Sequence, residues 1–214
     1  MFRTKVHTLR RDQGRLNGPL LSFLLGALGA LAIFLPFLIV DKGFFLYAGD
    51  YNCQQIPFYM YVQDFIKSMG GTWSWATDLG SSVVNSYSFY NIGSPFLWLP
   101  LPFPNSWMPY LMVPLFALKF GCIAAAANLY LSRYTKSRNL AVIVSLVYAF
   151  CGFNVSNIFF NHMLDPVVLF PLMLWAMDGF VYEKKRGWFA VAVGLALLNS
   201  YFFFVGNVVF LLIY

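Results

Sequence analysis

Four apolar runs, each close to the thickness of a bilayer's hydrocarbon core, constrain this chain more than any other feature. A helix needs about 20 predominantly apolar residues to cross that core. We expect these spans at residues 19–40, 108–131, 140–160 and 166–182. A fifth apolar stretch, residues 188–214, is either one long helix or two short ones. The runs therefore predict an all-α polytopic membrane protein.

Composition excludes several other classes of protein. Charged residues make up 10% of the chain and hydrophobic residues 60%, whereas an ordinary soluble domain carries about 25% charged residues. The three cysteines form neither a disulfide framework nor a metal-binding spacing. No P-loop, dinucleotide-binding motif or serine-nucleophile elbow is present. Soluble-type catalysis, nucleotide hydrolysis and nucleic-acid binding therefore find no support.

The lysines and arginines predict how the chain is oriented. They concentrate in the N-terminal tail (residues 1–18), in "RYTKSR" and in "EKKR". Short cytoplasmic segments collect such residues, and all three lie on one side if each run crosses once. We therefore expect a multi-pass membrane protein with a cytoplasmic N-terminus and an extracellular loop at residues 41–107. Because the chain stops inside an apolar run, we also expect it to be part of a longer protein.

The loop of residues 41–107, called the long loop below, is too long to be a simple connection between two spans. Apolar residues recur at helical spacing from about residue 57 to 69, which predicts an amphipathic helix lying in the membrane interface. Beyond it, residues 72–104 are rich in Trp, Tyr, Phe, Gly, Ser and Pro. These residues form either interfacial aromatics with turns, or a structured lip over a lipid-facing cavity.

Asp50 follows a glycine where the chain leaves the first span. An aspartate in this position is commonly a turn or cap residue. A carboxylate at the membrane surface is also suited to act as a general base, or to hold a divalent cation against a phosphate. Gln54 shares its face if the turn is helical. Asp41, beside Lys42, is the second and less favoured candidate.

Three further polar residues lie in or beside the spans. Lys119 falls near the middle of the second span, where a charge is costly unless it is paired or functional. Its ammonium would bind either a lipid phosphate or a buried carboxylate. Asp165 precedes Pro166, the pattern of a helix N-cap with proline at the first helical position. His162, three residues earlier, is a candidate acid, base or ligand at the outer surface.

An ordered series of motifs resembles the N-terminal part of the bacterial YfhO-type membrane proteins. The motifs are "GDYNCQQIPFY" (49–59), "WSWATDLGS" (73–81), "SYSFYNIGSPF" (86–96), "LKFG" (118–121), "YAFCGFNVS" (148–156) and "HMLDPVVLFPL" (162–172). That family is similar to the GT-C class of glycosyltransferases, which use a polyprenyl-phosphate sugar donor. The resemblance implies sugar transfer at the outer face, with lipoteichoic acid as an acceptor in the cell wall.

The resemblance also implies roles for individual residues. The acidic residue of the first GT-C loop falls on Asp50, with Asp41 as the weaker match. Gln54 and Lys119 match family positions and are expected to bind substrate, with Asp165 and His162 as weaker candidates. Many GT-C loops carry an adjacent Asp-Glu pair, whereas Asp50 is followed by Tyr51. Metal use therefore stays open.

Two other functions compete with sugar transfer. In a transporter or flippase for a lipid-linked sugar, Asp50 and Lys119 line a path and perform no chemistry. Internal repeats along a complete chain would favour that class. In a non-catalytic subunit, Asp50→Asn has no effect. The lipid bilayer, a lipid-linked sugar and a cell-wall polymer are the expected partners, and no resident cofactor is implied.

Overall fold

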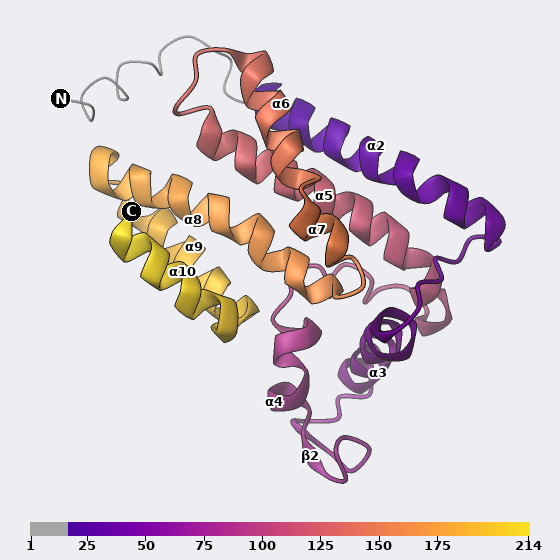
Figure 1. Cartoon of the computed structure of the whole chain (residues 1–214). Helices are drawn as coiled ribbons and strands as arrows, with labels where there is room; N and C mark the ends of the chain where they lie inside the picture. The colour runs from indigo at the N-terminus through magenta and orange to yellow at the C-terminus, as the bar shows by residue number, and fades with distance from the viewer. Residues whose placement is uncertain (1–16) are drawn as a thin grey trace.

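The structure is a computed structural model that describes residues 17–214 (Figure 1). It confirms an all-α polytopic membrane protein. By length and composition, four helical segments are able to cross a membrane: Asn17–Val40, Asn105–Leu131, Arg138–Ser156 and Asn161–Glu183. Apart from its last two residues, the predicted basic tail (residues 1–18) lies outside the described residues.

Helix α2 (Asn17–Val40) packs against α5 (Met108–Leu131) along a row of small residues. A Cβ atom added at Gly26 would lie 2.9 Å from the Phe120 carbonyl oxygen and 3.2 Å from the Gly121 Cα. Small residues let two membrane helices approach closely, since packing holds them together where lipid supplies no hydrophobic drive. The opposite face of α2 exposes the leucines that lipid would cover: Leu20, Leu24, Leu28, Leu31 and Leu35.

The third predicted span is interrupted, whereas the sequence analysis treated residues 140–160 as continuous. Helix α6 (Arg138–Ala149) ends, and the short helix α7 (Gly152–Ser156) begins after an extended residue at Cys151. Carbonyl groups released from a helix in the membrane need new donors. The Asn154 side chain supplies them, because its Nδ2 lies 2.9 Å from the carbonyl oxygens of both Tyr148 and Ala149.

Helix α8 (Leu164–Glu183) packs against both α5 and α9 (Arg186–Asn199). Helix α10 (Tyr201–Ile213) follows α9 after Ser200, whose backbone is extended (φ −159°, ψ 109°). The last apolar stretch therefore consists of two short helices, one of the two arrangements that hydropathy left open.

The two basic segments among the described residues, "RYTKSR" and "EKKR", lie at one end of the helices. The Arg138 guanidinium donates to the carbonyl oxygen of Asn17 (3.3 Å), so the start of α6 lies beside the start of α2. Arg133 and Glu183 form an ion pair (3.1 Å), which joins the end of α5 to the end of α8. The long loop lies at the other end, with α3 (Ile56–Lys67), α4 (Val83–Tyr87) and β2 (Ser81–Ser82) (Figure 1).

The long loop is largely structured. A π-helical turn, η1 (Tyr51–Gln55), runs directly into α3 (Ile56–Lys67). Two short strands follow, pairing Trp73 with Ser82 and Ser74 with Ser81. The remaining elements are β1 (Trp73–Ser74), β2 (Ser81–Ser82), α4 (Val83–Tyr87), the π-helical turn η2 (Ser88–Ile92) and the 3₁₀ turn η3 (Asn105–Trp107).

Helix α3 is amphipathic, and its buried side faces protein. Tyr59, Val62 and Gln63 are buried, and α3 contacts α5 and η2. The Gln63 amide donates to the carbonyl oxygens of Pro100 (3.0 Å) and Phe103 (2.9 Å), which ties α3 to the end of the long loop. The loop is therefore held together by its own contacts as well as by the helices beneath it.

Candidate functional site

Asp50 begins the η1 turn, and its side chain is exposed. Gly49 directly before it has φ +84°, a backbone conformation that side chains disfavour and glycine accepts. This requirement explains the Gly-Asp pair in the sequence. Within the described residues, the Asp50 carboxylate makes no capping hydrogen bond to the turn that it starts. The carboxylate therefore remains open to solvent.

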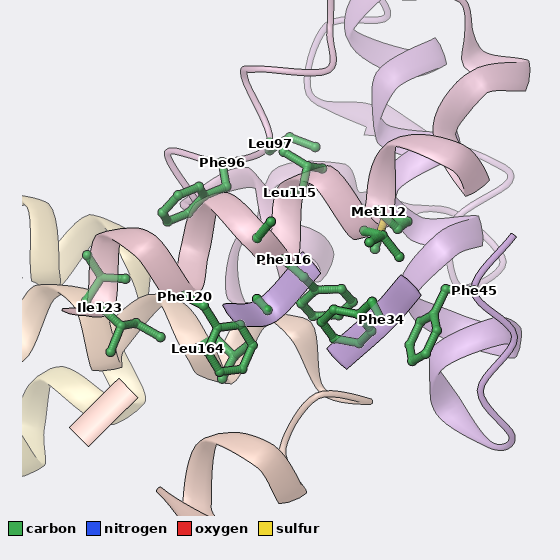
Figure 2. Close-up of a cluster of buried hydrophobic side chains, with 14 of the residues drawn as sticks. Phe34, Phe45, Phe96, Leu97, Met112, Leu115, Phe116, Phe120, Ile123 and Leu164 are labelled. Atoms are coloured by element: carbon green, nitrogen blue, oxygen red, sulfur yellow. The ribbon is translucent and has the colours of Figure 1, made fainter. Parts of the chain in front are cut away.

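Tyr51, the next residue, anchors this turn in an aromatic cluster. Its side chain is fully buried, stacking on Phe116 of α5 (ring centroids 5.8 Å apart) and meeting Phe45 edge-on (5.3 Å). Phe34 of α2 also stacks on Phe116 (5.4 Å), and Figure 2 shows Phe34, Phe45 and Phe116 grouped together. Aromatic contacts of this kind add to the stabilisation from burial. Asp50 is thus exposed, while the residue next to it is held in the packed interior.

A buried ion pair lies beneath the long loop. The Lys119 Nζ of α5 is 2.5 Å from Oδ1 of Asp165 in α8, and the two side chains are 0% and 1% exposed. Asn161 adds its backbone oxygen at 3.0 Å and its side-chain oxygen at 2.7 Å from the same nitrogen. Phe96 of the long loop covers the ammonium, whose nitrogen lies 5.1 Å from the ring centroid. A buried charge needs such pairing.

Two hydrogen bonds connect Asn161 and its neighbour His162 to the long loop. Asn161 Nδ2 donates to the Tyr59 hydroxyl of α3 (3.2 Å), and His162 Nδ1 lies 3.3 Å from Gln55 Oε1 at the end of η1. Burial, followed by the negative charge of Asp165, raises the pKa of the Tyr59 hydroxyl well above its usual range. Tyr59 therefore stays neutral and keeps its hydrogen-bonding capacity.

The end of α9, where the chain breaks before α10, also contacts the buried ion pair. Asn199 Nδ2 donates to Oδ2 of Asp165 (3.4 Å). Gly93, just after η2, fits closely here, since an added Cβ would lie 2.1 Å from the Leu198 carbonyl oxygen. The long loop thus docks against α9 at the point where α9 ends. We call Lys119, Asp165, Asn161, His162, Gln55, Tyr59 and Asn199 the polar layer.

Two sequence-based interpretations of the layer are wrong. Asp165 does not cap α8, because the helix begins at Leu164 with Met163 at the cap position, and the carboxylate binds Lys119. His162 does not lie at the surface, since it is only 5% exposed and meets the rings of Phe89 and Tyr90. A short turn, η4 (Asn161–Met163), precedes α8 and carries both Asn161 and His162 inward.

The sequence analysis named Gln54, but the neighbouring Gln55 reaches the polar layer. Gln54 is half-buried, and its Oε1 accepts from Gln55 Nε2 (3.4 Å). Asn161, Tyr59 and Asn199 were also missed. Tyr59 stands inside a quoted motif, Asn199 inside an apolar run and Asn161 in the short connection between two expected spans, and a neutral side chain at such a position gives no charge signal. Their contacts depend on a turn and a helix break that periodicity does not reveal.

The remaining named residues lie apart from the polar layer. Asp41 is half-buried at the turn that follows α2, and its backbone amide donates to the Phe37 carbonyl oxygen (2.8 Å). Within residues 17–214, no group of three or more His, Cys, Asp or Glu side chains comes together as a metal site. A divalent cation at Asp50 stays a prediction.

Comparison with known proteins identifies the family. The model of the family described as "Bacterial membrane protein YfhO" matches residues 22–214. The chain belongs to this family. The YfhO match includes the long loop, the polar layer, α2 from residue 22 onward and every later helix.

A curated relative is the "Uncharacterized protein YfhO" of Bacillus subtilis (strain 168), which is 32% identical over 68 residues. That alignment covers 29% of this chain and 8% of the Bacillus protein. No solved structure matches the chain.

Proposed function

We propose that this YfhO-family chain is part of a membrane glycosyltransferase of the GT-C type. It transfers a sugar from a polyprenyl-phosphate donor to a cell-envelope acceptor such as lipoteichoic acid. The reaction takes place at the outer face of the bacterial plasma membrane, with the long loop outside and the N-terminus in the cytoplasm. The observation that carries the proposal is the Asp50 carboxylate, exposed to solvent on a turn whose next residue is fully buried.

Asp50 acts as the general base in this proposal. Its carboxylate takes the proton from an acceptor hydroxyl while the hydroxyl oxygen forms a bond to the anomeric carbon of the sugar. The bond from that carbon to the donor phosphate breaks, and the polyprenyl phosphate leaves with the electron pair. Fixed geometry favours the step, because a catalytic group held by a rigid support loses less freedom on reaching the transition state.

Other residues of the long loop offer contacts for the two substrates. In this proposal the half-buried amide of Gln54, in the turn that Asp50 begins, hydrogen-bonds an acceptor hydroxyl. Exposed aromatic side chains of the long loop provide faces for a sugar ring or a prenyl chain: Tyr47, Trp73, Trp75, Trp98 and Trp107.

The test is Asp50→Asn, made in the protein as expressed in its own bacterium. At equal membrane abundance, we expect sugar released from purified lipoteichoic acid to fall about 10²- to 10⁴-fold, the usual contribution of a general base. Asp41→Asn tests the weaker candidate. Asp78→Asn is the matched control, since Asp78 is also an exposed carboxylate of the long loop and accepts from Ser86 (3.0 Å). Unchanged sugar content in Asp50→Asn would refute the assignment.

One observation favours the second candidate, a transporter or flippase for a lipid-linked sugar. Helix α9 is shorter than a full span, and an extended residue at Ser200 separates it from α10; discontinuous helices form substrate sites in many transporters. That function predicts movement of a fluorescent polyprenyl-phosphate sugar across proteoliposomes made with the complete protein. It also predicts that no sugar transfer accompanies this movement.

A further inference from the structure

The ammonium of Lys119 is fully engaged inside the protein. A lysine has three N–H donors, and its nitrogen lies within 3.0 Å of three oxygen atoms, one from Asp165 and two from Asn161. The side chain is completely buried, and the ring of Phe96 covers it. The ammonium is therefore not exposed to a lipid phosphate; of the two partners expected from the sequence, it has the buried carboxylate.

The polar layer connects Lys119 to the turn that carries Asp50. Asn161, held by Lys119, donates to Tyr59 in α3, and its neighbour His162 meets Gln55 at the end of η1. The turn is also held at its beginning, where Tyr51 stacks on Phe116. Phe116 and Lys119 are three residues apart on α5 and so share one helix face. One face of α5 thus holds both ends of η1.

We propose that Lys119 and Asp165 are positioning residues, whose ion pair fixes the η1 turn, and with it Asp50, through Asn161 and the contact of His162 with Gln55. This proposal rests on the proposed function of Asp50 and gives Lys119 no contact with substrate.

Two variants separate positioning from folding. Gln55→Met removes the hydrogen bond between Gln55 and His162 and leaves the ion pair in place. The double variant Lys119→Met with Asp165→Leu replaces both charges by apolar side chains of similar volume, a change that buried ion pairs commonly tolerate, whereas removal of one partner does not. Ser145→Ala is the matched control, because it removes a buried hydrogen bond to Ser22 (2.9 Å) that joins α6 to α2.

Cys53 reports on the position of the turn, because it lies in η1 and is exposed. With Cys122 and Cys151 replaced by alanine, the rate at which a membrane-impermeant maleimide labels Cys53 measures how firmly η1 is held. We expect labelling to accelerate at least fivefold in both test variants and sugar transfer to fall at least tenfold, with neither changed in Ser145→Ala. Affinity for undecaprenyl phosphate in detergent should stay within twofold of the parent.

The outcomes separate the two proposals. Unchanged Cys53 labelling in Gln55→Met overturns the positioning role, even where the double variant fails to accumulate. A tenfold loss of affinity for undecaprenyl phosphate in the double variant, with unchanged labelling, overturns it in favour of a phosphate ligand. If labelling accelerates while Asp50→Asn leaves sugar transfer intact, the ion pair does hold η1 and the catalytic assignment of Asp50 fails.

Discussion

Asp50 and Asp165 are the same residue type in opposite surroundings. Asp165 is 1% exposed, forms an ion pair with Lys119 and accepts a hydrogen bond from Asn199. Asp50 is exposed, and within the described residues its side chain makes no capping hydrogen bond to the turn that it begins. A buried charge persists only where partners offset the loss of hydration. An exposed carboxylate keeps its hydration and remains accessible to a substrate. Asp165 therefore contributes mainly to the fold, and Asp50 is free to contribute to chemistry.

The largest expected effect on stability comes from Asp165→Asn. This change keeps the side chain's shape and leaves the Lys119 ammonium buried without its counter-charge. Removal of one partner from a buried ion pair costs about 3–5 kcal/mol, so we expect the free energy of unfolding in detergent to fall by about that amount.

Asp178→Asn is the control for that loss. Asp178 is also buried, but it accepts from the neutral hydroxyls of Tyr134 (2.7 Å) and Tyr214 (3.1 Å). Its replacement should cost about 1.5–3 kcal/mol, as expected for hydrogen bonds to a charged group. Equal losses for the two variants would mean that the counter-charge of Lys119 has no special importance.

A second prediction concerns Gly93, where the long loop meets the end of α9. A Cβ atom at this position would lie 2.1 Å from the Leu198 carbonyl oxygen, so Gly93→Ala forces the two segments apart. Overpacking of this kind costs about 1–3 kcal/mol. Thermal unfolding in detergent and the rate of Cys53 labelling both measure the effect.

The control for Gly93→Ala is Gly194→Ala, in the interior of α9. An added Cβ there meets nothing within 4 Å, and alanine favours a helix over glycine by about 1 kcal/mol. We expect this variant to be slightly stabilised and to leave Cys53 labelling unchanged. If both variants behave alike, the close contact at Gly93 does not determine how the loop docks.

The sequence predicts the spans better than the polar layer, for a physical reason. Hydropathy integrates over about 20 residues, so α2 and α5 stand out regardless of their neighbours. Lys119 was recognisable as a paired or functional residue because a charge inside a span is rare. Its partner was not, because Asp165 beside Pro166 matches a cap pattern that needs no distant residue. Only the packing of α5 on α8 distinguishes the two interpretations.

The same limit explains why Gln54 was chosen over Gln55. The prediction used α-helical spacing from Asp50, whereas residues 51–55 form a π-helical turn. Such turns are rare and often occur at functional sites, and sequence periodicity does not identify them. The direction of each side chain in this turn therefore had to come from the structure.

A smaller effect is expected from Tyr59→Phe. The variant keeps the buried ring and removes the hydroxyl that accepts from Asn161 (3.2 Å). Leaving the buried Asn161 donor unpaired costs about 1–3 kcal/mol. We expect a value near the low end of this range, because the Asn161 side chain keeps its bond to Lys119. Thermal unfolding in detergent measures this loss of stability. A loss as large as that of Asp165→Asn would mean that the Tyr59 hydroxyl stabilises the polar layer as much as the ion pair does.

The smallest effect on stability is expected from Asp50→Asn. Exposed substitutions away from caps and networks usually change the free energy of unfolding by less than about 0.5 kcal/mol, and the Asp50 side chain makes no capping bond that asparagine would lose. The thermal transition in detergent should therefore stay close to that of the parent protein. A loss above about 1 kcal/mol would show that Asp50 supports the η1 turn itself, and any loss of sugar transfer in this variant would then reflect a displaced turn. Only an unchanged transition together with lost transfer separates the chemistry of Asp50 from the structural role that Asp165 fills.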